Sequence, residues 1–490
     1  MKSSNFMCRA ASWLAIASLG MSLNAATQPG AATNQAWEPL IVHPVKDAAT
    51  VEMLRAALKE PDPVVRERAL EALAIIRDGA QPRRAPTLTP TNLPEALRGT
   101  NTLAVIHALR GLDADTARRE ASTLIALLRR PEAVVQEEAA RAIQRGQIVA
   151  AGSDLFVRLN DPDEGLRLAA CEALASMVDR VPRPELLAGM VRRLETDPSS
   201  QVRQVAGLAL AALHDAPSRD ALVRLLKHDR GVTRASAAAA LGAWGDSELA
   251  GTLHPLLGDP ADLVARNAAH ALGQLRNPAS KAPLIAAFKT RSSVVLERAA
   301  WALGEFKSTE AVPAMIAQLG TTDEVFKVSL VLALGKTGDK QALPPMRQVL
   351  QQIVLTNNLP RAREAAFVVL TEARDKVAIP RAIQMVTTPV VPPVPGAGPT
   401  FDEDFVRIAG LRYLSTVGDR ATGMALLAND RWYVPRGLRA ELAETLSKLL
   451  GQAYQPVADE DYRRYFVETT TPRAPSALPP LGIVRETRGK

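Results

Sequence analysis

The sequence predicts an all-α fold in which short helix pairs stack into a right-handed α-solenoid, and three observations predict it. Of the 490 residues 47% are hydrophobic but only 4% are aromatic, so the core must use Ala, Leu and Val, which suit close helix contacts. An Ala-Leu-Gly step recurs every 31 residues, and it stands at the C-terminal end of a row of apolar residues with helical spacing. Because one pair of short helices cannot bury its stripe alone, about ten pairs must stack.

The first element is expected to be a signal peptide over residues 1–25. Lys2 and Arg9 supply a positive end, an apolar run follows, and Ala25 offers a small residue at the cleavage point. The run is too short to span a bilayer comfortably. We therefore expect a periplasmic or secreted mature chain without a transmembrane segment, which begins with a linker over 26–46. The alternative is that residues 1–25 form an uncleaved N-terminal membrane anchor.

The repeated helices are marked by a key apolar residue, which is a leucine in most units. Apolar residues lie eight, four and one positions before it and draw one stripe along a helix. Asp-Pro steps are expected to open these helices, and the glycine after the leucine is expected to stop them. A second short helix is expected in each unit, as over 221–226, 283–288 and 313–319. The key residues are Leu73, Ile143, Leu174, Leu210, Leu241, Leu272, Leu303, Leu334, Leu370, Leu414 and Leu446.

Interruptions of the repeat predict the domain organisation. The solenoid is expected over 47–386 with a basic, Pro-rich loop at 77–100, followed by a Pro-rich loop at 387–400, irregular repeats and a cap over 401–467, and a mobile basic tail over 468–490. Within the cap, Asp459–Val467 is expected to cover the last apolar stripe. The net charge of +7 lies in the signal, the first loop and the tail, so the solenoid is neutral and no nucleic-acid partner is expected.

The units resemble a known family. The pattern Asp-Pro, Val-Arg, Ala-Ala, Ala-Leu-Gly, seen for example from Asp197-Pro198 to Val202-Arg203 and in the steps around Leu241 and Leu272, is similar to HEAT-like repeats. The resemblance is to the short type found in phycobilisome lyases and many bacterial scaffold proteins. It implies a right-handed α-solenoid and a role in macromolecular binding, and it names no partner.

Arginines recur seven positions before the key leucine, or six in one unit, and acids stand at the turns before them. A basic row of this kind suits either phosphate binding or a structural ladder between repeats. We interpret it as a ladder that pairs each arginine with the acid of the preceding turn, because the solenoid has no net positive charge. Its members are Asp161, Arg167, Asp197, Arg203, Asp229, Arg234, Asp259 and Arg266.

A candidate binding site lies two positions before the key leucine, where residues vary although the stripe does not. His270 and Trp301 occupy this position in successive units, and Asn267 and Arg298 stand one turn earlier. Such a combination of side chains is typical of a binding hot spot if the four gather on one face. The alternative is that Trp301 packs between adjacent helices and His270 fills a gap beside it.

Enzyme signatures are missing from the sequence. It contains no phosphate-binding glycine loop, nucleophile elbow, C-x-x-C or H-E-x-x-H pattern, and none of its six histidines stands four positions from another. Nor does it carry the His-Glu steps of the HEAT-like iron hydroxylases. Of its two cysteines Cys8 lies in the expected signal, which leaves Cys171 without a disulfide partner. No catalytic residue, metal or cofactor is expected.

The leading hypothesis is therefore an exported, non-enzymatic scaffold that binds another protein. One alternative is a binder of an anionic polymer or membrane surface through the basic loop and tail, with affinity that falls with salt. The other is a lyase-like enzyme with an unrecognised site near His270 and Arg298. The sequence predicts neither the partner's identity nor the oligomeric state.

Overall fold

The structure is a computed structural model, and it describes residues 48–59, 66, 69–70, 72–73, 93–289, 291–351, 359–387, 403–428, 436–456 and 483–485. The expected signal peptide and linker, the expected Pro-rich loop after Thr387 and the expected capping segment Asp459–Val467 lie outside these residues. The chain divides into two compact units, Met1–Trp244 and Gly245–Lys490. Each unit is described by itself.

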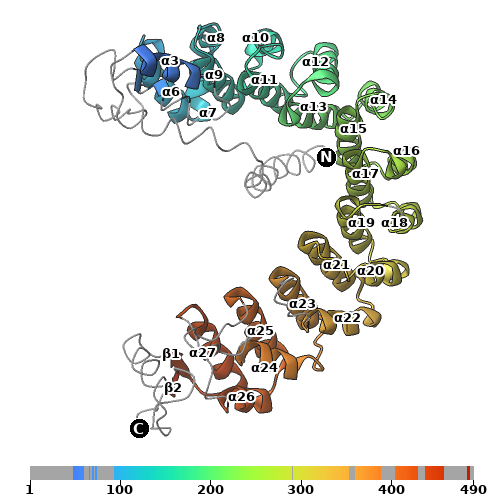
Figure 1. Cartoon of the computed structure of the whole chain (residues 1–490). Helices are drawn as coiled ribbons and strands as arrows, with labels where there is room; N and C mark the ends of the chain where they lie inside the picture. The colour runs from blue at the N-terminus through green and yellow to red at the C-terminus, as the bar shows by residue number, and fades with distance from the viewer. Residues whose placement is uncertain are drawn as a thin grey trace. The chain divides into compact units, whose positions relative to one another are not determined.

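In unit 1, helices that carry the key residues stack side by side, and a second set of helices packs against them (Figure 1). We name these sets the leucine layer and the partner layer. The leucine layer contains α9 (Ala133–Gly146), α11 (Glu164–Ser176), α13 (Ser200–Leu213) and α15 (Gly231–Trp244), and the partner layer contains α8 (Ala121–Leu127), α10 (Gly152–Arg158), α12 (Arg183–Thr196) and α14 (Ala216–Leu225). Before them come α3 (Ala48–Ala57), α5 (Leu93–Arg98), α6 (Thr102–Gly111) and α7 (Ala114–Arg119), and the 3-10 turn η2 spans Val149–Ala151.

Unit 2 repeats the same two layers. Its leucine layer contains α17 (Asp262–Leu275), α19 (Ser293–Glu305), α21 (Glu324–Thr337), α23 (Pro360–Glu372), α25 (Asp404–Val417) and α27 (Arg436–Leu450). Its partner layer contains α16 (Ala250–Leu253), α18 (Lys281–Ala287), α20 (Val312–Ala317), α22 (Leu343–Val349), α24 (Ile379–Thr387) and α26 (Arg420–Leu427). The 3-10 turns are η3 (Ser247–Leu249), η4 (His254–Gly258), η5 (Pro278–Ser280), η6 (Thr309–Ala311) and η7 (Lys340–Ala342).

The core lies between the two layers, and the key residues form it. Every key residue from Ile143 to Leu446 is 0% exposed, and Leu73 is partly buried against a smaller cluster around Leu54. The predicted stripe and the predicted partner helices are therefore confirmed, and the fold is an all-α solenoid of stacked helix pairs. None of the helices in the described part of the chain is both long and apolar enough to cross a membrane.

The prediction that glycine stops the helices is wrong. Helix α17 continues past Gly273 to its last residue, Leu275. Its C-cap is Arg276, whose φ of 52° places it in the left-handed region. A Cβ on Gly273 would lie 2.8 Å from the Cβ of Ala302 in the next helix of the leucine layer. The glycine is needed because the two helices approach too closely for a side chain there.

The aspartates of the Asp-Pro steps do not cap the helices directly. The carboxylate of Asp197 accepts a hydrogen bond from the Ser199 amide at 3.0 Å, and Asp161 accepts one from Asp163 at 3.1 Å. Ser199 and Asp163 are then the N-caps of α13 and α11. Each Asp thus stabilises the turn that leads into the helix, and a second residue caps the helix.

Two expected irregular segments contain regular structure. The prediction of a loop over 77–100 is wrong at its end, because Leu93–Arg98 forms α5. Leu93 and Leu97 are buried one turn apart, and Pro94 lies in the first turn, where a helix tolerates it. Inside the expected tail, strand β2 (Ile483–Arg485) pairs antiparallel with β1 (Tyr454–Pro456). The remaining residues of both segments lie outside the described ranges, apart from Gly99 and Thr100 after α5.

Candidate functional site

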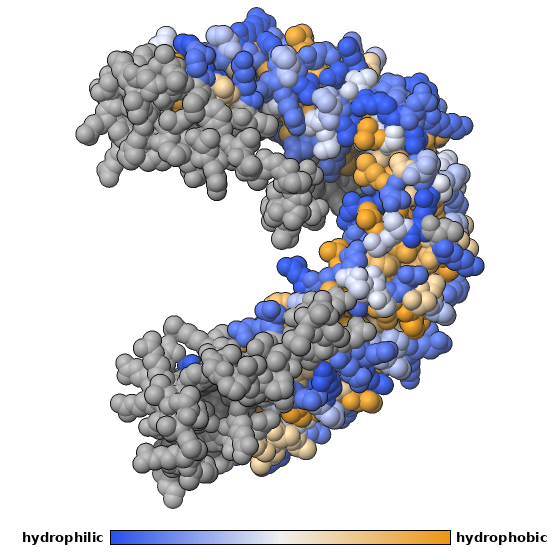
Figure 2. Space-filling view, in the orientation of Figure 1, coloured by the Kyte–Doolittle hydropathy of each residue, from blue (hydrophilic) through white to orange (hydrophobic). Residues whose placement is uncertain are grey.

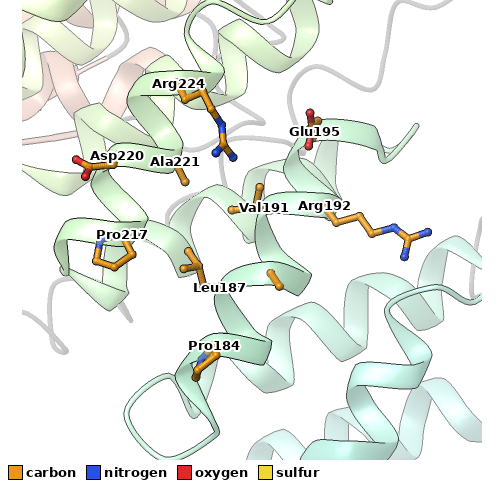
Figure 3. A pocket seen from close by; sticks show the side chains of 10 residues that line it. Pro184, Leu187, Val191, Arg192, Glu195, Pro217, Asp220, Ala221 and Arg224 are labelled. Carbon is orange, nitrogen blue, oxygen red and sulfur yellow. The ribbon is translucent and has the colours of Figure 1, made fainter.

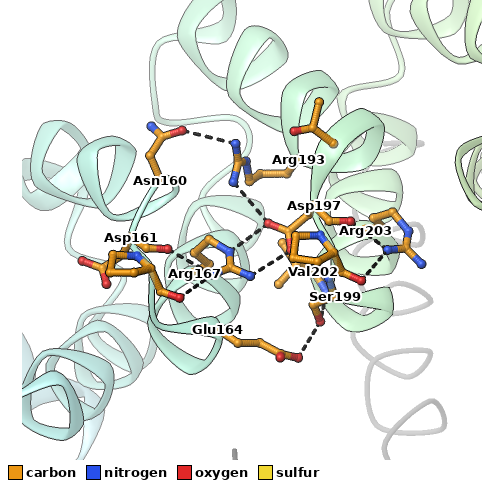
Figure 4. A network of polar contacts seen from close by, with 12 residues as sticks. Asn160, Asp161, Glu164, Arg167, Arg193, Asp197, Ser199, Val202 and Arg203 are labelled. Carbon is orange, nitrogen blue, oxygen red and sulfur yellow. Dashed lines mark hydrogen bonds and ion pairs between the residues drawn. The ribbon is translucent and has the colours of Figure 1, made fainter. Parts of the chain in front are cut away.

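The arginine ladder binds the preceding turns through their carbonyl groups. Nη1 of Arg203 donates to the carbonyl oxygens of Asp197 and Pro198, both at 2.8 Å (Figure 4). Nη1 of Arg167 makes the same pair of bonds to Asp161 and Pro162, both at 3.0 Å. The predicted turn is correct, but Arg203 and Arg167 donate to its main-chain oxygens and not to its carboxylate.

One carboxylate of the ladder does form a buried ion pair. It is that of Asp197, in the turn before α13, which is the turn of the next unit relative to Arg167. Asp197 is 1% exposed and accepts hydrogen bonds from Arg167 at 2.9 and 3.0 Å and from Arg193 at 3.2 Å (Figure 4). The hydrogen bond to Asp197 is also the largest cause of the raised pKa of the Arg167 guanidinium. The α11, α12 and α13 helices are therefore joined through one acidic side chain.

The other predicted ladder residues vary in detail. Nη1 of Arg234 donates to the carbonyls of His228 and Asp229 at 2.8 and 2.9 Å, so the pattern of Arg203 is repeated. Asp259 instead accepts at its carbonyl from Arg291 of the next unit at 2.7 Å. Arg266 stands one position out of register. Its guanidinium lies 3.9 Å from the carboxylate of Glu297, and not of the predicted Asp259.

The ladder continues further than the sequence analysis recognised. Seven positions before the key leucines of α21, α23, α25 and α27 stand four more basic residues that are at most 7% exposed: Lys327, Arg363, Arg407 and Arg439. The same register that identified Arg203 identifies these four. Burial lowers the pKa of the Lys327 ammonium. The burial of all four side chains favours a structural ladder over a phosphate-binding row.

His270 and Trp301 are brought together as predicted. Their ring centroids lie 4.6 Å apart with an interplanar angle of 35°. The Trp301 ring also covers Gly273, since a Cβ there would lie 2.5 Å from Cζ3 of the indole. Both side chains remain partly accessible on the surface of the leucine layer. They therefore pack between helices and also present part of each ring to solvent.

A charged cluster adjoins this pair. Two guanidinium groups share the Glu297 carboxylate at long distances, 3.9 Å from Arg266 and 3.6 Å from Arg298. Burial and Arg266 lower the pKa of Arg298, which Glu297 partly offsets. Within the described structure, Nε of Arg266 and Nδ1 of His270 are buried without a hydrogen-bond partner. Asn267 lies half-buried on α17, one turn before His270.

This environment predicts acid sensitivity. Burial first, and then Arg298 and Arg266, lower the pKa of His270 from 6.5 to about 4. Between these values the unfolded chain binds a proton that the folded chain does not, so stability is full above pH 6.5 and falls toward pH 4. The loss attributable to His270 is on the order of 2 to 3 kcal/mol.

The measurement is urea denaturation at pH 7 and pH 4.5 for the unaltered chain and for His270→Gln. The variant should lose less stability between the two pH values. His214→Gln, at an exposed histidine of unit 1, is the control and should decline like the unaltered chain. An equal decline for His270→Gln would contradict the prediction.

A second His–Trp pair was not recognised from the sequence. His214 follows α13 in the left-handed region, with a φ of 50°, and stacks on Trp244 at a centroid distance of 4.6 Å and 22°. The signal was the separation of 30 residues, which is close to the repeat length and similar to that between His270 and Trp301.

Exposed apolar side chains gather on one face of unit 2. Among the described residues nine large apolar side chains are strongly exposed, and six of them stand two or nine positions before a key leucine of this unit. Because seven positions are two helical turns, both rows lie on the same side of the leucine layer. Figure 2 shows apolar surface among polar residues along this part of the chain. We define the apolar face as Leu263, Val294, Val325 and Phe405 in row nine and Leu332 and Val368 in row two.

The apolar face continues the candidate site. His270 and Trp301 occupy row two on α17 and α19, directly before Leu332 on α21 and Val368 on α23. In row nine Arg361 takes the place on α23 and interrupts the apolar series. Row two stands out in the sequence because its residues vary, whereas row nine was not predicted from the sequence.

A groove in unit 1 lies between α12 and α14 of the partner layer (Figure 3). Leu187, Val191 and Ala221 point into it, whereas Arg192 and Asp220 point away. It contains no histidine, hydroxyl or cysteine side chain, and thus no nucleophile with a base beside it.

The described ranges hold no group of three or more His, Cys, Asp or Glu side chains that suits a metal ion. Cys171 is buried in α11, and burial raises the pKa of its thiol to about 12, so the reactive thiolate is disfavoured.

The chain is similar to several solved structures. The chain resembles importin beta over 85% of its own length and 64% of that protein, with 13% identity and a TM-score of 0.53. It also matches the CpcE and CpcF complex of phycocyanin lyase from Nostoc sp. PCC7120 (22% identity, 47% of this chain and 94% of that chain, TM-score 0.28) and human deoxyhypusine hydroxylase (20%, 55% and 96%, TM-score 0.25). No curated protein matches the sequence.

The likeness to importin beta shows the fold alone, and the family follows from the repeats themselves. The HEAT repeat family matches residues 121–211, 152–242, 219–297 and 282–366, which together span half of the chain. The resemblance noted in the sequence is thereby confirmed. The chain belongs to the HEAT-repeat family.

Proposed function

We propose that the chain is an exported, non-catalytic scaffold that binds another protein through the apolar face of unit 2. HEAT repeats form a solenoid fold that suits protein interaction in general. The residues 1–25 support export, and the missing catalytic motifs support a role without catalysis. The proposal places the partner on the leucine layer and not in the groove between α12 and α14.

The observation that carries the proposal is the alignment of the exposed apolar residues. Single exposed apolar side chains are common on protein surfaces, but a continuous patch is typical of an interaction site. Val325 is 64% exposed and Leu332 is 40% exposed, and both belong to rows that repeat on successive helices. We infer that a partner covers these exposed side chains.

The test is cross-linking capture of partners from the envelope fraction of the source cells, with the mature chain as bait. A stoichiometric protein partner should be recovered, and Leu332→Asp should reduce its capture at least about tenfold, because a buried carboxylate without a partner is costly. Met424→Asp is the matched control, since Met424 is 54% exposed but lies on α26 of the partner layer.

Other outcomes would replace the proposal. Recovery of salt-labile polyanions alone would favour the anionic-surface alternative. Turnover of a substrate that His270→Ala abolishes in a folded protein would favour the enzyme. For export, the N-terminal sequence of the mature chain is expected to begin near Ala26, and a chain that begins at Met1 would contradict the signal peptide.

A further inference from the structure

We propose that the apolar face of unit 2 binds an extended acidic segment of the partner, with an apolar side chain at every third residue and a carboxylate beside Arg298. This inference rests on the proposed function and adds the chemistry of the partner. Three features of the face carry it: the spacing of row two, the aromatic pair at one end of that row, and the excess positive charge beside the pair.

The spacing of row two favours an extended ligand. The row places one side chain on each of four successive helices, α17, α19, α21 and α23. Packed helices lie about 8 to 10 Å apart. A polyproline II segment has three residues per turn and rises about 3.1 Å per residue, so every third side chain advances by about 9 Å along one side. A β-strand, which repeats about every 7 Å on one side, falls out of step after two helices.

The aromatic pair supplies a flat surface for such a segment. His270 and Trp301 are in ring contact at 4.6 Å, and the indole is held in place against Gly273 of α17. Because the ring is packed before any ligand arrives, little conformational entropy is lost when a prolyl or aliphatic side chain lies on it. Aromatic surfaces are the usual docking sites for polyproline II segments.

The charge beside the pair favours a carboxylate. Arg266 and Arg298 share one carboxylate, Glu297, and neither of these contacts is shorter than 3.6 Å. Two buried nitrogen atoms, Nε of Arg266 and Nδ1 of His270, make no hydrogen bond within the described structure. A glutamate or aspartate of the partner would balance the second guanidinium and offer acceptors to this cluster. A basic segment would instead meet the excess positive charge.

The other two residues of row two are apolar and uncharged. Leu332 and Val368 are 40% and 45% exposed, and both follow Trp301 in the direction of the C-terminus. The polar end of the ligand is therefore fixed at α17 and α19, and its apolar residues lie toward α21 and α23. This order gives the segment one direction across the helices.

The test selects randomised displayed peptides on the purified full chain and counter-selects them on Leu332→Asp. Enriched peptides should carry Asp or Glu near one end and apolar residues at positions i, i+3 and i+6. For the best peptide, measured by fluorescence anisotropy, Arg298→Gln and Val368→Asp should each weaken binding at least about tenfold, and Met424→Asp should leave it unchanged. Replacing the peptide's acidic residue by Gln should abolish the effect of Arg298→Gln.

Three results would overturn the inference: enriched peptides that are basic, enriched peptides with helical i, i+4 spacing, or no enrichment over the counter-selection. Capture of the natural partner separates this failure from that of the proposed function. If capture depends on Leu332 but not on Arg298, the face binds a protein of different chemistry. If capture depends on neither residue, the proposed function itself is wrong. Circular dichroism of each variant before use establishes that it is folded.

Discussion

Replacing Asp197 by alanine should cost about 3 kcal/mol or more of the free energy of unfolding. The carboxylate is 1% exposed and neutralises both Arg167 and Arg193, which are 7% and 8% exposed. Removing one partner of a buried ion pair leaves uncompensated charge in a region of low dielectric constant, and such changes typically cost about 3 to 5 kcal/mol. The Ser199 amide also loses its acceptor, so the turn before α13 is weakened too.

The measurement is urea denaturation followed by circular dichroism, and Asp229 provides the control. It lies in the corresponding turn of the next unit, at the position of Pro198, and its side chain is exposed. Asp229→Ala should change stability by less than about 0.5 kcal/mol, as surface substitutions usually do. If the two variants were equally stable, Asp197 would not be a centre of the contact among α11, α12 and α13.

Replacing Gly304 by alanine should destabilise unit 2 by roughly 1 to 3 kcal/mol, although alanine is the better helix former. A Cβ on Gly304 would lie 2.9 Å from Cα and 3.2 Å from Cβ of Ala333. The obstacle is main chain, which cannot rotate away as a side chain can. Helices α19 and α21 would have to separate, and the stripe around Leu303 and Leu334 would lose contact.

The control is a glycine without this constraint. Gly251 lies in α16, and nothing stands within 4 Å of the position of its Cβ. Gly251→Ala should therefore raise stability by up to about 1 kcal/mol, because alanine restricts the unfolded chain and favours the helix. Opposite signs for the two substitutions in thermal denaturation would support close packing, whereas stabilisation by both would contradict it.

Much of the fold was predictable because each repeat places its apolar side chains at helical spacing along the sequence. A stripe of Ala and Leu with helical spacing determines which side of each helix is buried, independently of its neighbours. Leu272 and Leu303 were identified in this way, and each is 0% exposed. The prediction for Gly273 was wrong because a glycine near the end of a helix can either stop the helix or let the next helix approach closely. Only the position of Ala302 distinguishes these two roles.

The candidate site was predictable in part. His270 and Trp301 were expected to meet, since equal positions on stacked helices become neighbours. The long contacts of Glu297 with two guanidinium groups were not predictable, because side-chain conformations at an interface depend on the packing around them. The buried cations of the later units, such as Arg363 and Arg407, were open to the same register argument that found Arg203.

The sequence by itself determined the repeat, the all-α class, the buried stripe and the family, because these depend on periodicity along one chain. Only the tertiary structure decided which atoms the ladder arginines bind, why the glycines are needed, and that exposed residues such as Val325 and Leu332 align in rows on one face of unit 2. The reason is that contacts across the stack join residues about 30 positions apart. Their distances depend on how closely the helices pack, which the period of any one helix does not specify.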